Sequence, residues 1–349
     1  MVQNKSLVFS EVPDGLPEAG RHLQTYSTDF DLEVAPLSGG FTCQVLYASL
    51  DPYLRHRMVA PERARDGFEP MAVGSVVPNG LLGKVLKSDT AGFQADDIVI
   101  GMAPIQEYLS IPESLVAQFA KLENPHNLDL KLFLGPLGMP GLTAFSALYE
   151  IGKPKKGETI FISAASGAVG QMVGQLARRE GLRVIGSVGS EEKLKLLTEV
   201  FGFDGGFIHS TGDILGNIKR LAPDGIDIYY DNVGGEQLEA AITAMNDWGR
   251  IVACGYASQY SLPPESQYGI QNTGQIIGKR ITWRGMSVFD ESLGGAYRQT
   301  HLESVGEWLS DGSLKAVISE TVGIDNASQG LVELLQGKNI GKALVKIAA

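Results

Sequence analysis

The chain has 349 residues, of which 44% are hydrophobic and 20% charged, an ordinary globular composition with enough apolar residues for two cored domains. Its formal net charge of −11 and its lack of basic blocks argue against binding to the phosphate backbone of nucleic acids. Because it shows neither a leader peptide nor an apolar run of membrane-spanning length, we expect a cytoplasmic protein without membrane contact.

The first 128 residues predict an all-β, barrel-like unit. Glycine and proline repeatedly interrupt short apolar stretches, as they do between the strands of β-barrels. The predicted strands are residues 5–9, 30–36, 41–49, 80–86 and 97–101. After this region the pattern becomes helical, at residues 130–134 and 142–151, with the glycine- and proline-rich loop 135–141 between them.

The middle of the chain alternates between short apolar strands and helices. The predicted strands are residues 159–163, 183–188, 206–209, 226–231 and 249–254, and the predicted helices are residues 167–180, 191–201, 214–221 and 236–245. This alternation predicts an α/β fold with a doubly wound parallel sheet. Residues 279–288 are expected to add a strand to it, and residues 343–347 are β-like.

A glycine-rich turn follows the first of these strands. The pattern Ala165-x-Gly167-x-x-Gly170 lies between strand 159–163 and helix 167–180. Glycines at this spacing let the backbone approach a pyrophosphate at the helix N-terminus, whose dipole favours an anion. Alanine replaces the first glycine, and many βα turns are glycine-rich, so a purely structural turn is the alternative. The strand–turn–helix context favours a dinucleotide site.

The end of the next strand indicates which dinucleotide is bound. NAD sites place an acidic residue there for the ribose hydroxyls, whereas this chain has Gly186-Ser-Val-Gly189-Ser190. Lys193 follows in the first helical turn and could meet a 2′-phosphate, so the sequence predicts NADP. A solvated helix residue is the alternative interpretation of Lys193. We interpret Glu191 and Glu192 as acids that complement the helix dipole.

The sequence predicts neither a metal site nor a hydrolase nucleophile. Cys43 and Cys254 are far apart, and the five histidines do not combine with them at metal-ligand spacing. The chain also lacks a Gly-x-Ser-x-Gly elbow. A tyrosine or a hydroxyl of the cofactor would therefore have to polarise a substrate carbonyl.

Several segments together resemble a known enzyme family. They are Asp51-Pro-Tyr-Leu-Arg55, Gly138-Met-Pro-Gly-Leu-Thr-Ala144, Ala164-Ala-Ser-Gly-Ala-Val-Gly170, Asp231-Asn-Val-Gly-Gly235, Gly249-Arg-Ile-Val-Ala-Cys-Gly255 and Asn339-Ile-Gly-Lys342. Their order and spread resemble the medium-chain dehydrogenase/reductase superfamily. Within it they resemble the zinc-independent branch of prostaglandin (leukotriene B4 12-hydroxydehydrogenase-like) reductases and of alkenal or curcumin double-bond reductases.

The resemblance implies a GroES-like β-barrel domain over residues 1–128 and 305–349, and a Rossmann dinucleotide-binding domain over residues 129–304. It implies a homodimer that uses NADPH to reduce the C=C bond of an α,β-unsaturated aldehyde or ketone. Hydride would reach the β-carbon and a proton the α-carbon. A hydrogen-bond donor at the enolate-like oxygen would lower the barrier.

The resemblance also assigns cofactor contacts. The amides of Ala168 and Val169, with neighbouring Ala165, Gly167 and Gly170, would hold the pyrophosphate. Gly189 lies at the adenosine end, where Lys193 would meet the 2′-phosphate. His209 stands where family members often have tyrosine, and would meet the phosphate more weakly and with pH dependence.

The nicotinamide half is assigned in the same way. Asn232, Cys254 and Tyr260 would line it, the Val288 backbone would pair with the nicotinamide amide, and Asn339 with Gly341 would close over the cofactor. Tyr53 and Tyr260 would face the substrate, and one or both would donate to the developing oxyanion.

Structural roles are the alternatives for several of these residues. Tyr53 could be a packed aromatic, Asn232 could serve its own turn, and Cys254 could only fill space. Asp51 and Arg55 are expected to form a structural ion pair. At the level of function, the alternatives are a zinc-free quinone or ketone reductase of the same superfamily and a nonenzymatic NADPH-binding protein.

Overall fold

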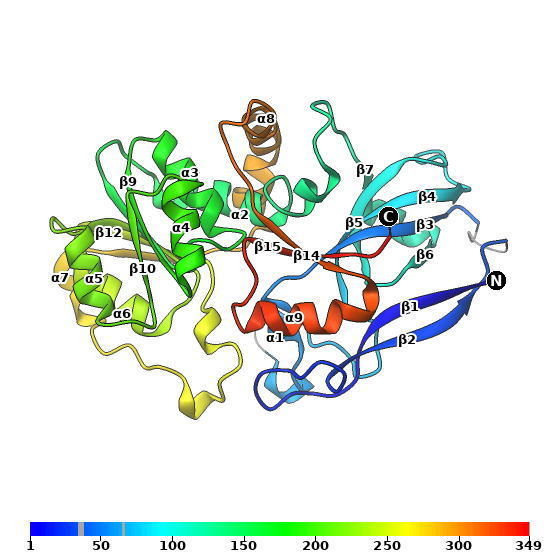
Figure 1. The fold of residues 1–349 in the computed structure, drawn as a ribbon, viewed down its shortest axis with the longest axis horizontal. Coiled ribbons are helices and arrows are strands. Elements are labelled where there is room, and N and C mark those ends of the chain that lie inside the picture. The colour runs from blue at the N-terminus through cyan, green and yellow to red at the C-terminus, as the bar shows by residue number, and fades with distance from the viewer. Residues whose placement is uncertain (34–37, 65–66, 349) are drawn as a thin grey trace. The chain divides into compact units, whose positions relative to one another are not determined.

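The computed structural model describes residues 1–33, 38–64 and 67–348 (Figure 1). The chain divides into two compact units. The first is Met1–Leu134 with Ile318–Ala349, and the second is Gly135–Val317. The sequence placed the corresponding domain limits after residues 128 and 304. The C-terminal segment belongs to the first unit because β15 (Lys342–Lys346) pairs antiparallel with β3 (Phe41–Ser49).

The first unit is built on a seven-stranded sheet with the order β14-β15-β3-β4-β5-β7, and β6 also pairs with β3. A separate antiparallel pair, β1 and β2, completes its strands. The remaining bounds are β1 Val2–Phe9, β2 Leu23–Phe30, β4 Pro78–Ser88, β5 Ile98–Pro104, β6 Tyr108–Ile111, β7 Phe119–Lys121 and β14 Ile318–Val322, with helices α1 Leu54–Arg57 and α9 Ala327–Leu335. An apolar core that includes Phe9, Phe41 and Leu54 lies in this unit.

Most of the strands predicted for this unit are confirmed, since residues 5–9, 41–49 and 80–86 lie within β1, β3 and β4, and 98–101 within β5. The predicted strand 30–36 is wrong over residues 31–33, which lie outside any strand, and residues 34–36 lie outside the described residues. The strand instead ends at Phe30, because β2 pairs with β1 along Val2↔Phe30 to Phe9↔Leu23. Most residues of β2 are polar, and half of them are exposed, so its sequence does not show the apolar pattern from which a strand is predicted.

The second unit is a six-stranded parallel sheet with the order β10-β9-β8-β11-β12-β13. Its strands are β8 Thr159–Ile162, β9 Arg183–Val188, β10 Gly205–Ile208, β11 Ile226–Asp231, β12 Met245–Ala253 and β13 Thr282–Gly285. Its helices are α2 Met139–Ala147, α3 Gly170–Arg179, α4 Glu191–Glu199, α5 Ile214–Leu221, α6 Gly235–Ala244, α7 Gly274–Lys279 and α8 Ala296–Ser310. The predicted doubly wound sheet is confirmed.

The strand order of this sheet is that of a Rossmann fold. The chain begins at β8 in the middle, runs outward through β9 and β10, and then returns to β11 on the other side of β8. Ligands of such sheets bind at the carboxyl ends of the strands, where the order reverses. The point of reversal here lies between β8 and β11.

Across the described part of the chain, helices of sufficient length and hydropathy to cross a membrane are absent. Within the same residues, no cluster of three or more His, Cys, Asp or Glu side chains could coordinate a metal ion.

Candidate active site

The glycine turn after β8 is held tightly to the neighbouring strand. Ala165 donates its N–H to the carbonyl of Ser187 in β9 at 2.9 Å, and Gly167 donates to the carbonyl of Ala164 at 2.9 Å. A Cβ at position 170 would lie 2.6 Å from the Ala164 oxygen. Only glycine therefore fits at Gly170, and the turn can deliver the chain directly into α3.

The N-terminus of α3 offers backbone donors. Ala168 and Val169 lie just before the helix and are half-buried. The Gln171 amide, at the second residue of the helix, bonds the Gly167 carbonyl at 3.0 Å. Unpaired first-turn amides at a helix N-terminus suit an anionic group such as a pyrophosphate.

The two serine hydroxyls at the carboxyl end of β9 already form hydrogen bonds within the protein. Ser187 donates to the Gln237 amide oxygen at 2.5 Å. Ser190 caps α4, because its hydroxyl accepts the Lys193 N–H at 3.3 Å. NAD enzymes have an acidic side chain at this strand end, which binds the ribose hydroxyls. In this chain the strand is followed by the helix cap Ser190, and Lys193 lies in the first turn of α4.

Two basic side chains meet near this strand end. Lys193 is only 9% exposed, and burial lowers the pKa of its ammonium group. The pKa of His209 is also lowered, first by loss of hydration and then by the positive charge of Lys193. The His209 Nε2 atom would lie 3.7 Å from a Cβ at Gly189. A dianionic group placed here would stabilise both cations.

The turn after β11 is organised by a buried carboxylate. Asp231, 2% exposed, accepts hydrogen bonds from the Tyr229 hydroxyl at 2.8 Å and from the amides of Val233 and Gly234 at 3.0 and 2.8 Å. Burial nevertheless raises the pKa of Asp231. These donors fix the turn 231–235 at the end of the sheet.

Asn232 ties β11 to β8 at the point where the strand order reverses. Its N–H donates to the Ser163 hydroxyl at 2.9 Å, and its Nδ2 donates to the Ser163 carbonyl at 2.8 Å. The side chain thus holds the ends of β8 and β11 together. Ser163, its partner, was not predicted as a site residue because nothing in its local sequence sets it apart.

Tyr260 and Cys254 lie beyond β12. The Tyr260 hydroxyl accepts the Tyr256 N–H at 3.2 Å and would lie 2.8 Å from a Cβ at Gly255, so it rests against the backbone there. The amides of Cys254 and Gly255 both donate to the Asp231 carbonyl, at 3.0 and 2.9 Å. Burial raises the pKa of the Cys254 thiol to about 12 and raises that of Tyr260 as well. The thiol stays protonated and is no nucleophile.

Val288 follows β13 and is 9% exposed. A Cβ at position 294 would lie 1.8 Å from the Val288 carbonyl oxygen, so only a glycine allows the backbone to pack this closely against that oxygen. Most of the predicted cofactor residues follow strands of the parallel sheet of the second unit: Ala165, Gly167, Ala168, Val169, Gly170, Gly189, Lys193, His209, Asn232, Cys254, Tyr260 and Val288.

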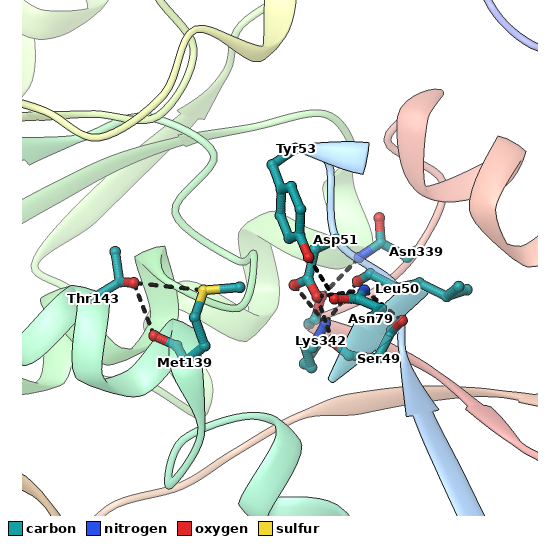
Figure 2. A network of polar contacts seen from close by, with 10 residues as sticks. Ser49, Leu50, Asp51, Tyr53, Asn79, Met139, Thr143, Asn339 and Lys342 are labelled. Atoms are coloured by element: carbon teal, nitrogen blue, oxygen red, sulfur yellow. Dashed lines mark hydrogen bonds and ion pairs between the residues drawn. The ribbon is translucent and has the colours of Figure 1, made fainter. Parts of the chain in front are cut away.

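Tyr53, Asn339 and Gly341 lie in the first unit. Tyr53 is half-buried, and its hydroxyl donates to Asn79 Oδ1 at 2.7 Å (Figure 2). The Asn339 amide donates to the Gly341 carbonyl at 2.7 Å, and Gly341 takes a positive φ of 72°. Asn339 thereby holds the turn that leads into β15.

The expected ion pair of Asp51 with Arg55 is wrong, because the ion-pair partner of Asp51 is Lys342, at 2.8 Å. Arg55 is buried and donates to the carbonyls of Gly15 at 2.8 Å and Met58 at 3.2 Å. Lys342 ends the segment Asn339–Lys342 that resembles the family, but nothing in its local sequence indicates its role. Lys342 and Asp51 are 291 residues apart in the sequence, so the sequence does not reveal that they form an ion pair.

Comparison with known proteins places this geometry in a family. The model of zinc-binding dehydrogenases matches residues 168–302, and that of the N-terminal domain of oxidoreductases matches residues 5–118. An NADP-dependent oxidoreductase, RED1, of Cochliobolus heterostrophus is 48% identical, with 100% of this chain and 99% of the relative covered. The NADP(+)-dependent 2-alkenal reductase of Nicotiana tabacum is 39% identical, with 99% and 98% covered.

A solved structure agrees with these relatives. CurA from Vibrio vulnificus, crystallised in complex with NADPH, superposes with a TM-score of 0.88 at 30% identity, and 99% of each chain is covered. The fold is accordingly a GroES-like domain with a Rossmann domain. The chain belongs to the medium-chain dehydrogenase/reductase superfamily of oxidoreductases, in the double-bond reductase branch that the alkenal reductases represent.

Proposed function

We propose that this chain is an NADPH-dependent reductase of the C=C bond in α,β-unsaturated aldehydes and ketones. The observation that carries the proposal is the full-length similarity to an NADP(+)-dependent 2-alkenal reductase. Lys193 supports it, because it follows the strand end where NAD enzymes have an acid, and His209 follows the adjacent strand. An NADP-dependent oxidoreductase is 48% identical to this chain over its whole length, which supports NADPH as the cofactor.

The residues fit NADPH. The amides of Ala168 and Val169 would hold the pyrophosphate at the N-terminus of α3, beside Gly167 and Gly170. Lys193 and His209 would hold the 2′-phosphate, whose charge offsets the cost of placing two cations side by side. Around the nicotinamide half, we propose contacts from Asn232, Cys254 and the Val288 backbone, and from Asn339 with Gly341.

When bound, NADPH supplies the hydride that the β-carbon of the enone receives. The protein's part is to stabilise the negative charge that develops on the carbonyl oxygen. We assign this donor role to Tyr260. Its hydroxyl oxygen accepts the Tyr256 amide hydrogen, so Tyr260 does not use its own hydrogen in that contact. Burial raises the pKa of Tyr260, and the Tyr256 contact offsets part of that rise. Asn232 acts on the same edge of the sheet by fixing the end of β11 to β8.

The test is consumption of NADPH by the purified protein with a panel of alkenals and enones, such as trans-2-hexenal and 4-phenyl-3-buten-2-one, with and without chelator. We expect turnover that chelator does not change. Much faster turnover of quinones would instead favour the quinone reductase alternative. Tight NADPH binding without turnover of any substrate would favour a nonenzymatic binding protein.

We also propose that the partner of this chain is a second copy of itself. β13 forms one edge of the parallel sheet, and all four of its residues are exposed, Trp283 among them. Two further large apolar side chains, Trp248 and Ile277, are 67% and 84% exposed. An unpaired strand edge with exposed apolar side chains is a surface that pairs readily. Sedimentation velocity at micromolar concentration should give a dimer, and Trp283→Lys should shift it to a monomer.

A further inference from the structure

A buried polar network in the first unit joins the end of β3 to β4 and β15 (Figure 2). Its centre is the Asp51 carboxylate, which accepts from Lys342 Nζ at 2.8 Å, from the Ser49 hydroxyl, and from Asn79 Nδ2 at 3.0 Å. Lys342 also donates to the Leu50 carbonyl at 2.6 Å. The side chains of Lys342 and Asp51 are 1% and 6% exposed, so this pair is shielded from solvent.

The network allows only one orientation of the Asn79 amide. Its Nδ2 donates to the Ser49 carbonyl at 2.7 Å as well as to Asp51. Both partners are acceptors, since a carbonyl and an ionised carboxylate carry no hydrogen. A flipped amide would place Oδ1 against two acceptors in a site that is 1% exposed. The chemistry of the partners therefore points Oδ1 toward Tyr53.

The orientation of Asn79 in turn determines what Tyr53 can do. Asn79 Oδ1 has no hydrogen, so the contact of 2.7 Å requires Tyr53 to donate its own. If the Tyr53 hydroxyl donated to a ligand instead, the buried Asn79 Oδ1 would lose its hydrogen-bond partner. That loss would lower the population of this state by about tenfold or more. The lone pairs of the Tyr53 oxygen remain for a ligand donor.

We infer that Asn79 is a positioning residue, held in one orientation by the Asp51–Lys342 pair, and that it makes Tyr53 a hydrogen-bond acceptor. Tyr53 then does not donate to the enolate oxygen, which leaves that work to Tyr260. The Asn79 amide lies between Tyr53 and Asp51 and does not titrate, so it cannot pass a proton from one to the other. Tyr53 therefore does not relay a proton from Asp51 to the α-carbon. The inference rests on the proposed function only for the identity of the ligand.

The hydrogen of Tyr53 can be followed without turnover. We would label the 11 tyrosines with 13C at Cζ, assign the Tyr53 signal by its loss in Tyr53→Phe, and record spectra in equal H2O and D2O. A hydroxyl that exchanges slowly gives two Cζ lines, one for each isotope. We expect two lines for Tyr53 in the native chain and one in Asn79→Leu. A single line in the native chain, or two lines in both, would overturn the inference.

A variant that removes both charges covers the case in which Asn79→Leu fails to fold. Asp51→Asn combined with Lys342→Met leaves no uncompensated buried charge, so the chain is expected to fold. It removes the carboxylate that fixes the Asn79 amide. We expect it to merge the two Tyr53 lines, whereas the control Lys342→Arg should keep both. Two lines in the double variant would contradict the role of the Asp51–Lys342 pair.

Kinetics then test the consequence for catalysis, with trans-2-hexenal as substrate. Tyr53→Phe should keep kcat within about threefold, because it removes an acceptor and no oxyanion donor. Asn79→Leu should change the substrate KM in the native background but not in the Tyr53→Phe background, since it acts through Tyr53. A kcat loss of tenfold or more in Tyr53→Phe, or an equal Asn79→Leu effect in both backgrounds, would refute this assignment. If no enone is turned over, the proposed function fails, and the NMR result still decides the inference.

Discussion

Lys193 and His209 follow adjacent strands of the Rossmann sheet, β9 and β10. Burial lowers the pKa of the His209 imidazole, and the positive charge of Lys193 lowers it further. An anionic ligand that contacts both side chains would interact with the Lys193 ammonium group and would favour the charged form of His209. The arrangement supports a 2′-phosphate near the carboxyl ends of β9 and β10.

Replacing Lys193 should separate the two cofactors. Lys193→Ala should raise the KM for NADPH by about tenfold, the scale of a lost charge-assisted hydrogen bond, while leaving use of NADH unchanged. Steady-state kinetics with both cofactors check this. The matched control is Lys195→Ala, an exposed lysine on the same helix. Equal weakening toward NADPH and NADH would mean that Lys193 does not contact the 2′-phosphate.

His209 should make the affinity for NADPH depend on pH. Since the pKa of the free side chain is lowered from 6.5, His209 is neutral at pH 7 and gains its charge only in more acidic solution. A bound 2′-phosphate favours the charged form. The Kd for NADPH should therefore fall as the pH is lowered below about 6.5, and His209→Gln should abolish that dependence. An unchanged pH profile in His209→Gln would argue against contact between His209 and the phosphate.

The donor role of Tyr260 has a direct kinetic consequence. Tyr260→Phe should lower kcat by about tenfold or more, because it removes one hydrogen bond that strengthens in the transition state. Tyr256→Phe is the matched control: it keeps the ring neighbour, whose centroid lies 5.2 Å away, and the backbone N–H that bonds Tyr260. We expect the control to stay within twofold. A native kcat in Tyr260→Phe would remove this residue from the oxyanion role.

A buried histidine should make the stability of the fold depend on pH. His301, 1% exposed, contacts the Pro136 carbonyl through Nε2 at 2.8 Å, and burial lowers its pKa from 6.5 to about 4. The unfolded chain takes up a proton near pH 6.5, whereas the folded chain resists it until about pH 4. The stabilising contribution is therefore fully present above pH 6.5 and is lost as the pH falls toward 4, by up to about 3 kcal/mol.

His301→Gln isolates this contribution, since a glutamine amide can still donate to Pro136 but does not titrate between these pH values. Urea unfolding from pH 7 to 4.5 should show a shallower loss of stability in His301→Gln than in the native chain. His301→Leu should cost about 1–3 kcal/mol at pH 7, because it leaves the Pro136 carbonyl unpaired. Parallel pH profiles for the native chain and His301→Gln would contradict this account.

The sequence predicted features that are encoded locally. The turn from Ala165 to Gly170 was recognisable because a strand, spaced glycines and a helix follow one another along the chain. The parallel sheet was recognisable from the alternation of apolar strands with helices. By contrast, β2 is polar and is defined by pairing with β1, and helix α8 carries no clear apolar face, so neither could be predicted.

The remaining site features depend on residues far apart in the chain. The sequence could not place Asn79 beside Tyr53 or Lys342 beside Asp51, since only the folded sheet brings β4, β15 and the end of β3 together. It could not tell that Asn232 binds Ser163 across the strand reversal. Sequence alone also gave His301 no role, because its partner is a backbone carbonyl 165 residues away.

Hydride transfer to a conjugated carbon–carbon double bond is tested most directly by following the transferred atom. Purified protein would be incubated with trans-2-hexenal and NADPH that carries deuterium at the transferable position of nicotinamide C4. We expect hexanal with one deuterium at C3, the former β-carbon, by mass spectrometry and NMR. Deuterium at C1 of 2-hexenol, which reports reduction of the carbonyl, would contradict the claim.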